Sequence, residues 1–437
     1  MSRPYLAVMG LLISGIFTIC RRKPRFAPKS PEGDFLRYFY NLYFLLAPCS
    51  LLLSLNACAQ TPSNAPIQSK VEIMPGAWAT ETFLPMLKGK RVGLLVNQTS
   101  TIGKTHLIDS LVSLGVNVVK LFAPEHGLRG TADAGAELSD SIDTKTGLPI
   151  ISLYGTKKTP SKEDLKDLDV VVFDIQDVGV RFYTYINTLQ YLMEAMAIVR
   201  KPLIVLDRPN PNGHYIDGPV LDFKYRSFVG LDPIPVVYGM TIGELGQLIN
   251  GEGWIYDTCY LTVIPCKHYD HNTMYDLPIK PSPNLPNLRS ILLYPGLCFF
   301  EGTNISIGRG TDKQFQVAGS PDYPNKKFSF TPKAVPGATN PPLKDKKCYG
   351  VNLANSNVDS LFALRHMDLS VLLSFYQKID TTGFFNASWF DKLAGGPTFR
   401  ESIQKGWSEE QIRESWKADI EKFKERRKRY LLYKDFE

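Results

Sequence analysis

The segment Leu121-Phe-Ala-Pro-Glu-His-Gly-Leu-Arg-Gly130 joins an apolar run to a cluster of polar residues and glycines. The run, residues 116–122, has the length and β-branched content of a strand that is buried on both faces of a sheet. It ends at a proline, and Glu125 and His126 follow directly. In open α/β sheets ligands bind beyond the carboxyl ends of the strands, so both residues are candidates for a site. The alternative is that Glu125 only caps a loop or pairs with Arg129.

Strand-like and helix-like segments alternate on either side of this run. The expected strands are residues 91–97, 116–122, 149–154, 169–174 and 202–207, and the expected helices are residues 105–114, 162–168 and 185–200. Regular alternation of this kind is typical of a parallel, doubly wound sheet. The polar clusters follow the strand ends, where a binding crevice forms in this architecture.

The pattern changes near residue 220, where Pro-rich loops and short mixed strands replace the alternation. We therefore expect an α/β fold in four parts. These are a signal and lipoprotein segment (1–58), a tether (59–70), a Rossmann-like domain with a doubly wound parallel sheet (71–220) and a smaller α+β C-terminal domain (221–437).

The chain closes with a strong helix signal. Ser408 and Gln411 form a capping box, and four apolar residues follow at helical spacing. These residues are Ile412, Trp416, Ile420 and Phe423.

The first 58 residues contain two apolar runs, 5–20 and 38–57, separated by a basic segment. The second run ends in Leu55-Asn-Ala-Cys58, which resembles a bacterial lipobox. We expect Cys58 to carry lipid and to anchor the protein to a membrane on the periplasmic side. The alternative is an ordinary signal or membrane-spanning segment that ends near a cysteine by chance.

The net charge gives no indication of nucleic-acid binding. The formal charge of +7 arises mainly in residues 1–58, which hold seven Lys or Arg and two Asp or Glu. The rest of the chain has 43 basic and 41 acidic residues and is therefore close to neutral.

Several motifs for cofactor or metal chemistry are missing from the sequence. GxGxxG, GxxxxGK[ST], GxSxG and HExxH do not occur, so no cofactor is expected. The four cysteines after residue 58 form no CxxC pair, which disfavours a metal cage. They are expected either to form one or two disulfides or to remain as buried thiols.

Acidic, amide and basic side chains gather on the expected loops. The carboxylates are Glu125, Asp174, Asp177, Asp207 and Glu301, and beside them lie His126, Arg181, Arg208, Asn210, Asn212, Asn304 and Arg309. Paired carboxylates with amide and Arg donors suit a carbohydrate site, because glycoside hydrolysis needs a proton donor and a second group that stabilises or attacks the anomeric carbon. Partial burial would raise the pKa of Glu125, as an acid requires, and Glu301 is its candidate partner. The structural alternatives are that Asp174 caps a turn and that Asp207 holds Arg208.

Several long motifs then identify a family. They are Ala123-Pro-Glu-His-Gly127, Phe173-Asp-Ile-Gln-Asp-Val-Gly-Val-Arg-Phe-Tyr-Thr-Tyr185, Leu206-Asp-Arg-Pro-Asn-Pro-Asn-Gly213, Tyr294-Pro-Gly296 and Glu301-Gly-Thr-Asn-Ile-Ser-Ile-Gly-Arg-Gly-Thr311. With the closing Tyr430-Leu-Leu-Tyr433 they resemble the YbbC/NamZ family, formerly a domain of unknown function, over about residues 70–437.

The resemblance implies an exo-β-N-acetylmuramidase that releases N-acetylmuramic acid from the non-reducing end of peptidoglycan fragments. It also implies a Rossmann-like domain and a smaller C-terminal domain with the active site between them. Glu125 would be the catalytic acid, with His126 and Glu301 in the catalytic set. The substrate-binding set would be Asp174, Asp177, Arg181, Arg208, Asn210, Asn304 and Arg309. An Arg near the site would suit the lactyl carboxylate of muramic acid.

Two other functions remain open at this point. One is a non-catalytic cell-wall glycan-binding lipoprotein. The other is a metal-dependent hydrolase that uses His126, Asp174 and Asp177, although no His-rich spacing supports it.

Overall fold

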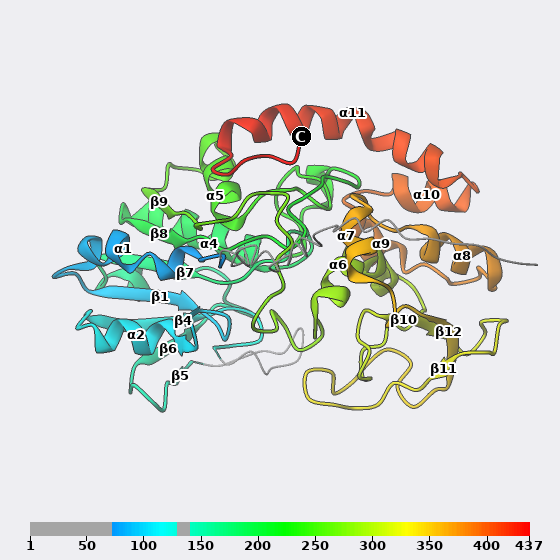
Figure 1. Ribbon diagram of the computed structural model, residues 1–437, viewed down its shortest axis with the longest axis horizontal. Coiled ribbons are helices and arrows are strands. Elements are labelled where there is room, and N and C mark those ends of the chain that lie inside the picture. The colour runs from blue at the N-terminus through cyan, green and yellow to red at the C-terminus, as the bar shows by residue number, and fades with distance from the viewer. Residues whose placement is uncertain (1–71, 129–139) are drawn as a thin grey trace, which may run out of the picture. The chain divides into compact units, whose positions relative to one another are not determined.

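Helices cover both faces of a central sheet, and a second group of helices with a small sheet follows along the chain (Figure 1). The computed structural model describes residues 72–128 and 140–437. These residues belong to one compact unit, Ser69–Glu437. The predicted signal and lipoprotein segment (1–58), the tether (59–70) and the lipidation site Cys58 lie outside the described residues.

The central sheet has seven strands in the order β5-β6-β4-β1-β7-β8-β9. The strands are β1 (Val92–Val96), β4 (Val118–Ala123), β5 (Ser141–Ile142), β6 (Pro149–Ser152), β7 (Val170–Asp174), β8 (Leu203–Leu206) and β9 (Leu261–Ile264). All neighbours are parallel except β5 and β6, which pair antiparallel. The α/β class and the expected parallel sheet are confirmed.

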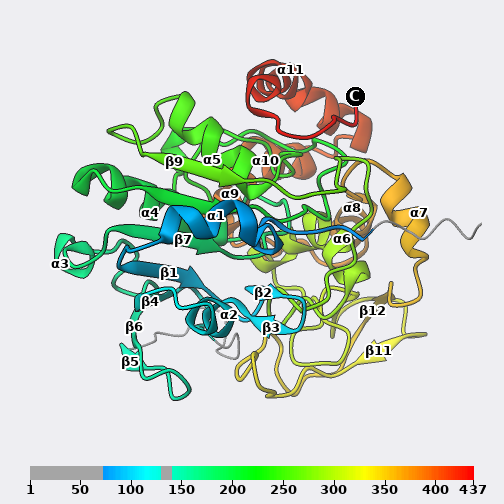
Figure 2. The same ribbon diagram turned by 60° about the vertical axis from the view of Figure 1, so that its left-hand side comes forward.

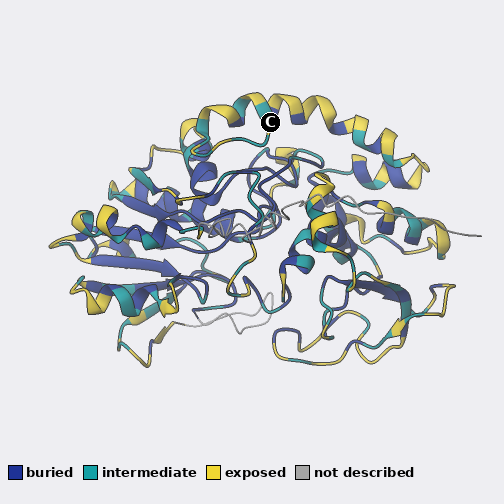
Figure 3. Ribbon diagram, in the orientation of Figure 1, coloured by how far each residue is buried: buried dark blue, intermediate teal, exposed yellow. Residues whose placement is uncertain are grey.

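Each face of the sheet packs into its own apolar core. In β7, Val171 and Phe173 belong to one core, whereas Val170 and Val172 belong to the other. This follows from the period of two along a strand, because alternate side chains point to opposite faces. The covering helices are α1 (Thr80–Leu87) and α2 (Leu107–Ser113) on one face and α4 (Tyr185–Val199) and α5 (Ile242–Gly251) on the other. The central strands β1, β7 and β8 are accordingly buried, while the outer surfaces of the helices are exposed (Figure 3).

The sheet continues past residue 220, where we expected the second domain to begin. β9 pairs in parallel with β8 and contributes the last strand. Helix α5 packs against both β9 and α4. β9 includes a polar residue, Thr262, and is only partly buried, whereas β8 has the same length but is entirely apolar and buried. The sequence signal of β9 is therefore weaker.

The remaining elements are mainly helical, as expected for an α+β part. They are α6 (Leu288–Leu297), η3 (Cys298–Gly302), α7 (Val358–Ala363), α8 (Ser370–Lys378), α9 (Ala387–Ala394), α10 (Thr398–Gln404) and α11 (Glu409–Arg427), with β10 (Val317–Ser320), β11 (Ser329–Phe330) and β12 (Cys348–Asn352). The three strands form a small antiparallel sheet in the order β10-β12-β11. Figure 2 shows this sheet apart from the parallel one.

The last helix, α11, connects the two groups of elements. Its capping box and its buried apolar stripe are as predicted. It extends from α10 to the vicinity of α5 (Figure 1), and the chain after it then packs against the parallel sheet. There the Tyr433 hydroxyl donates to Asp207 at 2.5 Å, and the Leu432 amide donates to Glu244 at 2.8 Å. The Asp207 side chain therefore binds Tyr433, whereas the structural alternative had it binding Arg208.

Two further expectations concern cysteines and the membrane. The four cysteines after residue 58 are all buried and free in the structure, so the thiol alternative holds; they are Cys259, Cys266, Cys298 and Cys348. Across residues 72–128 and 140–437, no helix is both long enough and apolar enough to cross a membrane.

One buried carboxyl gives a pH dependence of stability. Burial raises the pKa of Asp232 to about 7. The unfolded chain has an Asp pKa of about 3.9. Between these pH values the folded state therefore holds a proton that the unfolded chain has lost. The contribution of Asp232 to stability is complete below about pH 4 and is lost as pH rises through about 7. We expect Asp232→Asn to remove this part of the pH dependence of the free energy of unfolding, on the order of 1–4 kcal/mol. The amide can also donate to Gln190 Oε1, which has no hydrogen-bond partner within the described parts of the chain.

Urea unfolding from about pH 4 to about pH 8 measures this effect. The exposed Asp257 is the matched control, and Asp257→Asn should leave the slope unchanged. Equal slopes for the wild type and Asp232→Asn would contradict the assignment.

Candidate active site

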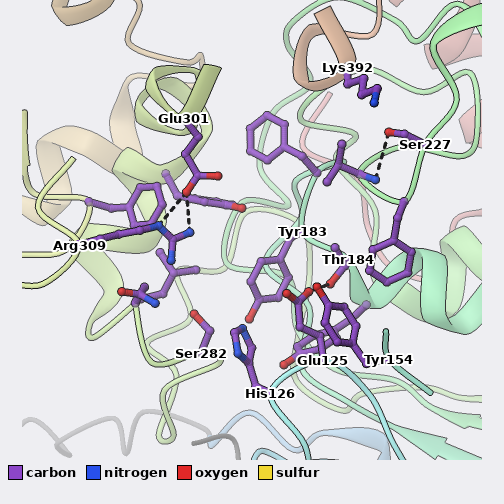
Figure 4. Close-up of a pocket in the computed structure, with 18 of the residues that line it drawn as sticks. Glu125, His126, Tyr154, Tyr183, Thr184, Ser227, Ser282, Glu301, Arg309 and Lys392 are labelled. Atoms are coloured by element: carbon purple, nitrogen blue, oxygen red, sulfur yellow. Dashed lines mark hydrogen bonds and ion pairs between the residues drawn. The ribbon is translucent and has the colours of Figure 1, made fainter. Parts of the chain in front are cut away.

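A cavity of about 480 Å³ lies beyond the carboxyl edge of the parallel sheet. Most of its walls come from the loop after β4, the loop after β7 and the chain from residue 282 to residue 392, and Tyr154 and residues 227–229 complete them. Figure 4 shows side chains from all three directed toward this space. The volume is in the range of sites that enclose a small ligand. Of the predicted residues, it brings together Glu125, His126, Glu301 and Arg309.

The turn after β4 positions the first two of these residues. The Gly127 amide donates to the carbonyl of Pro124 at 2.9 Å, which closes a tight turn. His126 has a φ of 67°, in the left-handed region that non-glycine residues rarely adopt. Such conformations cluster at functional sites, because the surrounding structure must offset their cost. Glu125 and His126 are only 9% and 8% exposed, and both line the cavity.

The loop after β7 supplies the residue that orients Glu125. The Thr184 hydroxyl donates to Glu125 Oε2 at 2.6 Å. Beside it, burial raises the pKa of the Tyr183 phenol well above 10, so Tyr183 remains a neutral hydroxyl. Its ring packs edge to face on Tyr185 with the centroids 5.0 Å apart. Arg129, the alternative partner of Glu125, lies outside the described residues.

The second carboxylate is held by an ion pair. Arg309 Nε and Nη2 lie 2.8 and 2.5 Å from Glu301 Oε1. The guanidinium also lies over the ring of Phe315, 5.1 Å from its centroid. In Figure 4, Glu301 and Arg309 lie on one side of Tyr183, and Thr184 and Glu125 lie on the other. The cavity therefore has two carboxyl groups with different partners, one beside a hydroxyl and one beside a cation.

Two predicted substrate-binding residues instead form a buried ion pair. Arg208 Nε and Nη2 lie 2.5 and 2.8 Å from the two oxygens of Asp174. Both side chains are almost fully buried. The pair ties the end of β7 to the end of β8 and does not line the cavity of Glu125. Arg208 lines a different cavity, beside Trp78 and Tyr275.

The other predicted residues also have structural partners. Asp177 accepts a hydrogen bond from the Tyr238 hydroxyl and one from the Gly179 amide. Asn210 Nδ2 donates to the Met240 carbonyl at 2.7 Å.

Arg181 is buried and donates to the carbonyls of Pro219, Ile234 and Leu393. Asn304 is exposed, and its backbone amide donates to the Phe384 carbonyl. The predicted lining residues Asp174, Asp177, Arg181, Arg208, Asn210 and Asn304 are thus absent from the described walls of this cavity.

The cavity also contains residues that the sequence did not single out. They are Tyr154, Thr184, Phe228, Trp389 and Lys392, among others. Thr184 lies within a motif that we quoted, but no spacing marks it as the partner of Glu125. Trp389 and Lys392 belong to an ordinary amphipathic helix, whose sequence does not show what its faces contact.

The metal-dependent alternative required His126, Asp174 and Asp177 to share a site. Within residues 72–128 and 140–437, no group of three His, Cys, Asp or Glu residues is placed to hold a metal ion. Asp174 and Asp177 already have the partners described above.

The buried ion pair leads to a stability prediction. We expect Arg208→Leu to destabilise the protein by roughly 3–5 kcal/mol, because it leaves the Asp174 carboxylate buried without its partner. Arg91 forms a similar pair with Asp169, but both side chains are largely exposed, so Arg91→Leu should change stability little. Urea unfolding of the three proteins gives the comparison. Unchanged stability of Arg208→Leu together with lost sugar binding would instead return Arg208 to the substrate site.

Comparison with known proteins gives consistent matches over the described region. Models of the family described as exo-beta-N-acetylmuramidase NamZ match residues 92–289 with the N-terminal part and residues 292–433 with the C-terminal part. The peptidoglycan beta-N-acetylmuramidase NamZ of Bacillus subtilis (strain 168) is 40% identical over 402 residues, which cover 86% of this chain and 95% of that protein.

Two solved structures are also similar, and both are DUF1343 family proteins of Bacteroides fragilis NCTC 9343. One is 46% identical with a TM-score of 0.78, and it matches 83% of this chain and 99% of its own. The other is 31% identical with a TM-score of 0.71 and the same coverage.

Proposed function

This chain belongs to the NamZ family of exo-β-N-acetylmuramidases, and we propose that it releases N-acetylmuramic acid from the non-reducing end of peptidoglycan fragments with Glu125 as the proton donor. It is a glycoside hydrolase. The observation that supports the catalytic assignment is the presence of two carboxyl groups, Glu125 and Glu301, in the walls of one cavity. Glycoside hydrolysis requires such a pair, because the leaving oxygen needs a proton while positive charge develops at the anomeric carbon.

Glu125 has the surroundings of the acid. It is almost fully buried, and the Thr184 hydroxyl holds Oε2 in place. A fixed carboxyl loses little orientational freedom when the substrate binds. The glycosidic oxygen accepts the proton from Glu125 as its bond to the anomeric carbon breaks, and a solvent water supplies the hydroxyl group that the anomeric carbon gains and returns a proton. His126 and Tyr183 line the same part of the cavity and bind the sugar around the reacting bond.

Glu301 acts as the charged partner. The Arg309 guanidinium binds its Oε1 with two nitrogens, which fixes the position of this side chain in the cavity wall. A carboxylate stabilises the positive charge that develops on the sugar ring in the transition state. The two groups thus differ in role because their neighbours differ.

Turnover of a chromogenic β-N-acetylmuramide tests the proposal. We expect Glu125→Gln to lower kcat by about 10²- to 10⁴-fold, since the amide keeps the shape but has no proton to give. The control is Glu163→Gln, which changes a highly exposed glutamate on α3 (Lys162–Leu165) and should leave kcat unchanged.

Three outcomes decide between the functions. Activity that survives Glu125→Gln would keep the enzyme and reject this acid. If the wild type and Glu125→Gln both bind the sugar and neither hydrolyses it, the glycan-binding lipoprotein would be favoured. Turnover of the matching glucosaminide at an equal rate would reject the muramic acid specificity.

We also propose a location for the enzyme. The lipobox-like Leu55-Asn-Ala-Cys58 after an apolar run supports a lipoprotein anchored at Cys58 on the periplasmic side of a membrane. Residues 59–70, rich in polar residues and proline, would separate the anchor from the enzyme.

Metabolic labelling with a fatty acid tests this anchor in the full chain. Label and membrane association should both be present in the wild type and absent in Cys58→Ser. Label that persists in Cys58→Ser would show that Cys58 is not the lipidated residue.

A further inference from the structure

Helix α9 (Ala387–Ala394) contributes an aromatic and a cationic side chain to the same cavity. Trp389 and Lys392 are three residues apart and therefore lie on one face of the helix. Phe390 and Leu393 are buried in the core and hold the other face. Trp389 is half-buried, whereas Lys392 is exposed, and Figure 4 shows Lys392 at the end of the cavity near Ser227.

The arginines that we expected to bind a substrate carboxylate are already engaged. Arg181 donates to three backbone carbonyls, and Arg208 is paired with Asp174 outside this cavity. Arg309 lines the cavity, but two of its nitrogens bind Glu301. The charge of Arg309 is thus already offset by a carboxylate, and a cation without such a partner is better placed to bind an anionic group on the substrate.

Lys392 is available for that contact. It forms no ion pair with any residue in the described parts of the chain. A lysine ammonium is a compact charge on a flexible stem, so it can follow a substituent that projects from a sugar ring. The neighbouring indole of Trp389 offers an apolar surface against which the ring can pack.

We propose that Lys392 is a specificity-determining residue that binds the lactyl carboxylate of the muramic acid unit, with Trp389 against the sugar beside it. This inference rests on the proposed function, since it concerns the substrate of the same cavity. The lactyl group distinguishes N-acetylmuramic acid from N-acetylglucosamine, and its carboxylate gives that sugar a negative charge. Lys392 recognises this charge and takes no part in bond cleavage.

The test compares two substrates, one with this charge and one in which a methyl ester removes it. They are a chromogenic N-acetylmuramide and its lactyl methyl ester. Lys392→Met keeps the unbranched stem of the side chain and removes its charged end group. We expect kcat/KM for the acid to fall roughly 10- to 100-fold, mainly through KM, as for the loss of one charge-assisted hydrogen bond. The value for the ester should change little, and Lys392→Arg should retain most of the preference for the acid.

Lys158 provides a matched control. Its ammonium lies 4.6 Å from the ring centroid of Phe228, which lines the cavity, but Lys158 is outside the described lining. Lys158→Met should therefore leave the ratio of acid to ester unchanged. An equal loss of activity on acid and ester in Lys392→Met, or no loss on either, would overturn the inference.

A binding measurement separates this inference from the proposed function. Calorimetry with free N-acetylmuramic acid and N-acetylglucosamine reports the preference without turnover. If the wild type hydrolyses neither substrate but binds the acidic sugar more tightly, the proposed function fails. Loss of that preference in Lys392→Met would still support the inference, and its retention would overturn it.

Discussion

The burial of β7 on both faces is the constraint on which the rest of this structure depends. All five of its residues are buried, and the first four alternate between two separate apolar cores. A strand in this position has no exposed face for polar side chains, so polar groups collect where it ends. The same holds for β8 and for the second half of β4, and the cavity and the Asp174–Arg208 pair both lie at these ends. Residues that stabilise the fold and residues that line the cavity therefore lie at the same edge of the sheet.

This shared location explains which parts of the site could be predicted from the sequence. Glu125 and His126 follow a strand end and line the cavity, but Asp174 and Asp177 follow one too and do not. Both pairs carry the same sequence signal, a polar residue after an apolar run. Only the three-dimensional positions of Arg208 and Tyr238 show that the aspartates have structural partners.

The fold was easier to predict than the site. Long apolar runs and apolar residues at helical spacing indicate burial directly. From these patterns β1, β4, β7, β8 and α11 were predicted close to their observed bounds. β9 and the extent of the sheet beyond residue 220 could not be predicted in this way, because a partly buried strand of four residues, one of them a threonine, has no long apolar run. Trp389 and Lys392 were missed for a different reason. A helix sequence shows which side is apolar, but it does not show that the other side faces a cavity.

The attachment of residues 432 and 433 to the parallel sheet has a consequence for the order of folding. Tyr433 binds Asp207 just after β8, and Leu432 binds Glu244 on α5. These partners are 226 and 188 positions apart along the chain, so each contact closes a long loop and carries a large entropic cost. Contacts between strands that are closer in sequence form at a lower cost, and the segment after α11 therefore docks on a sheet that has already formed. A substitution at Tyr433 would remove a late contact at residue 207 and would leave the early strand pairing intact.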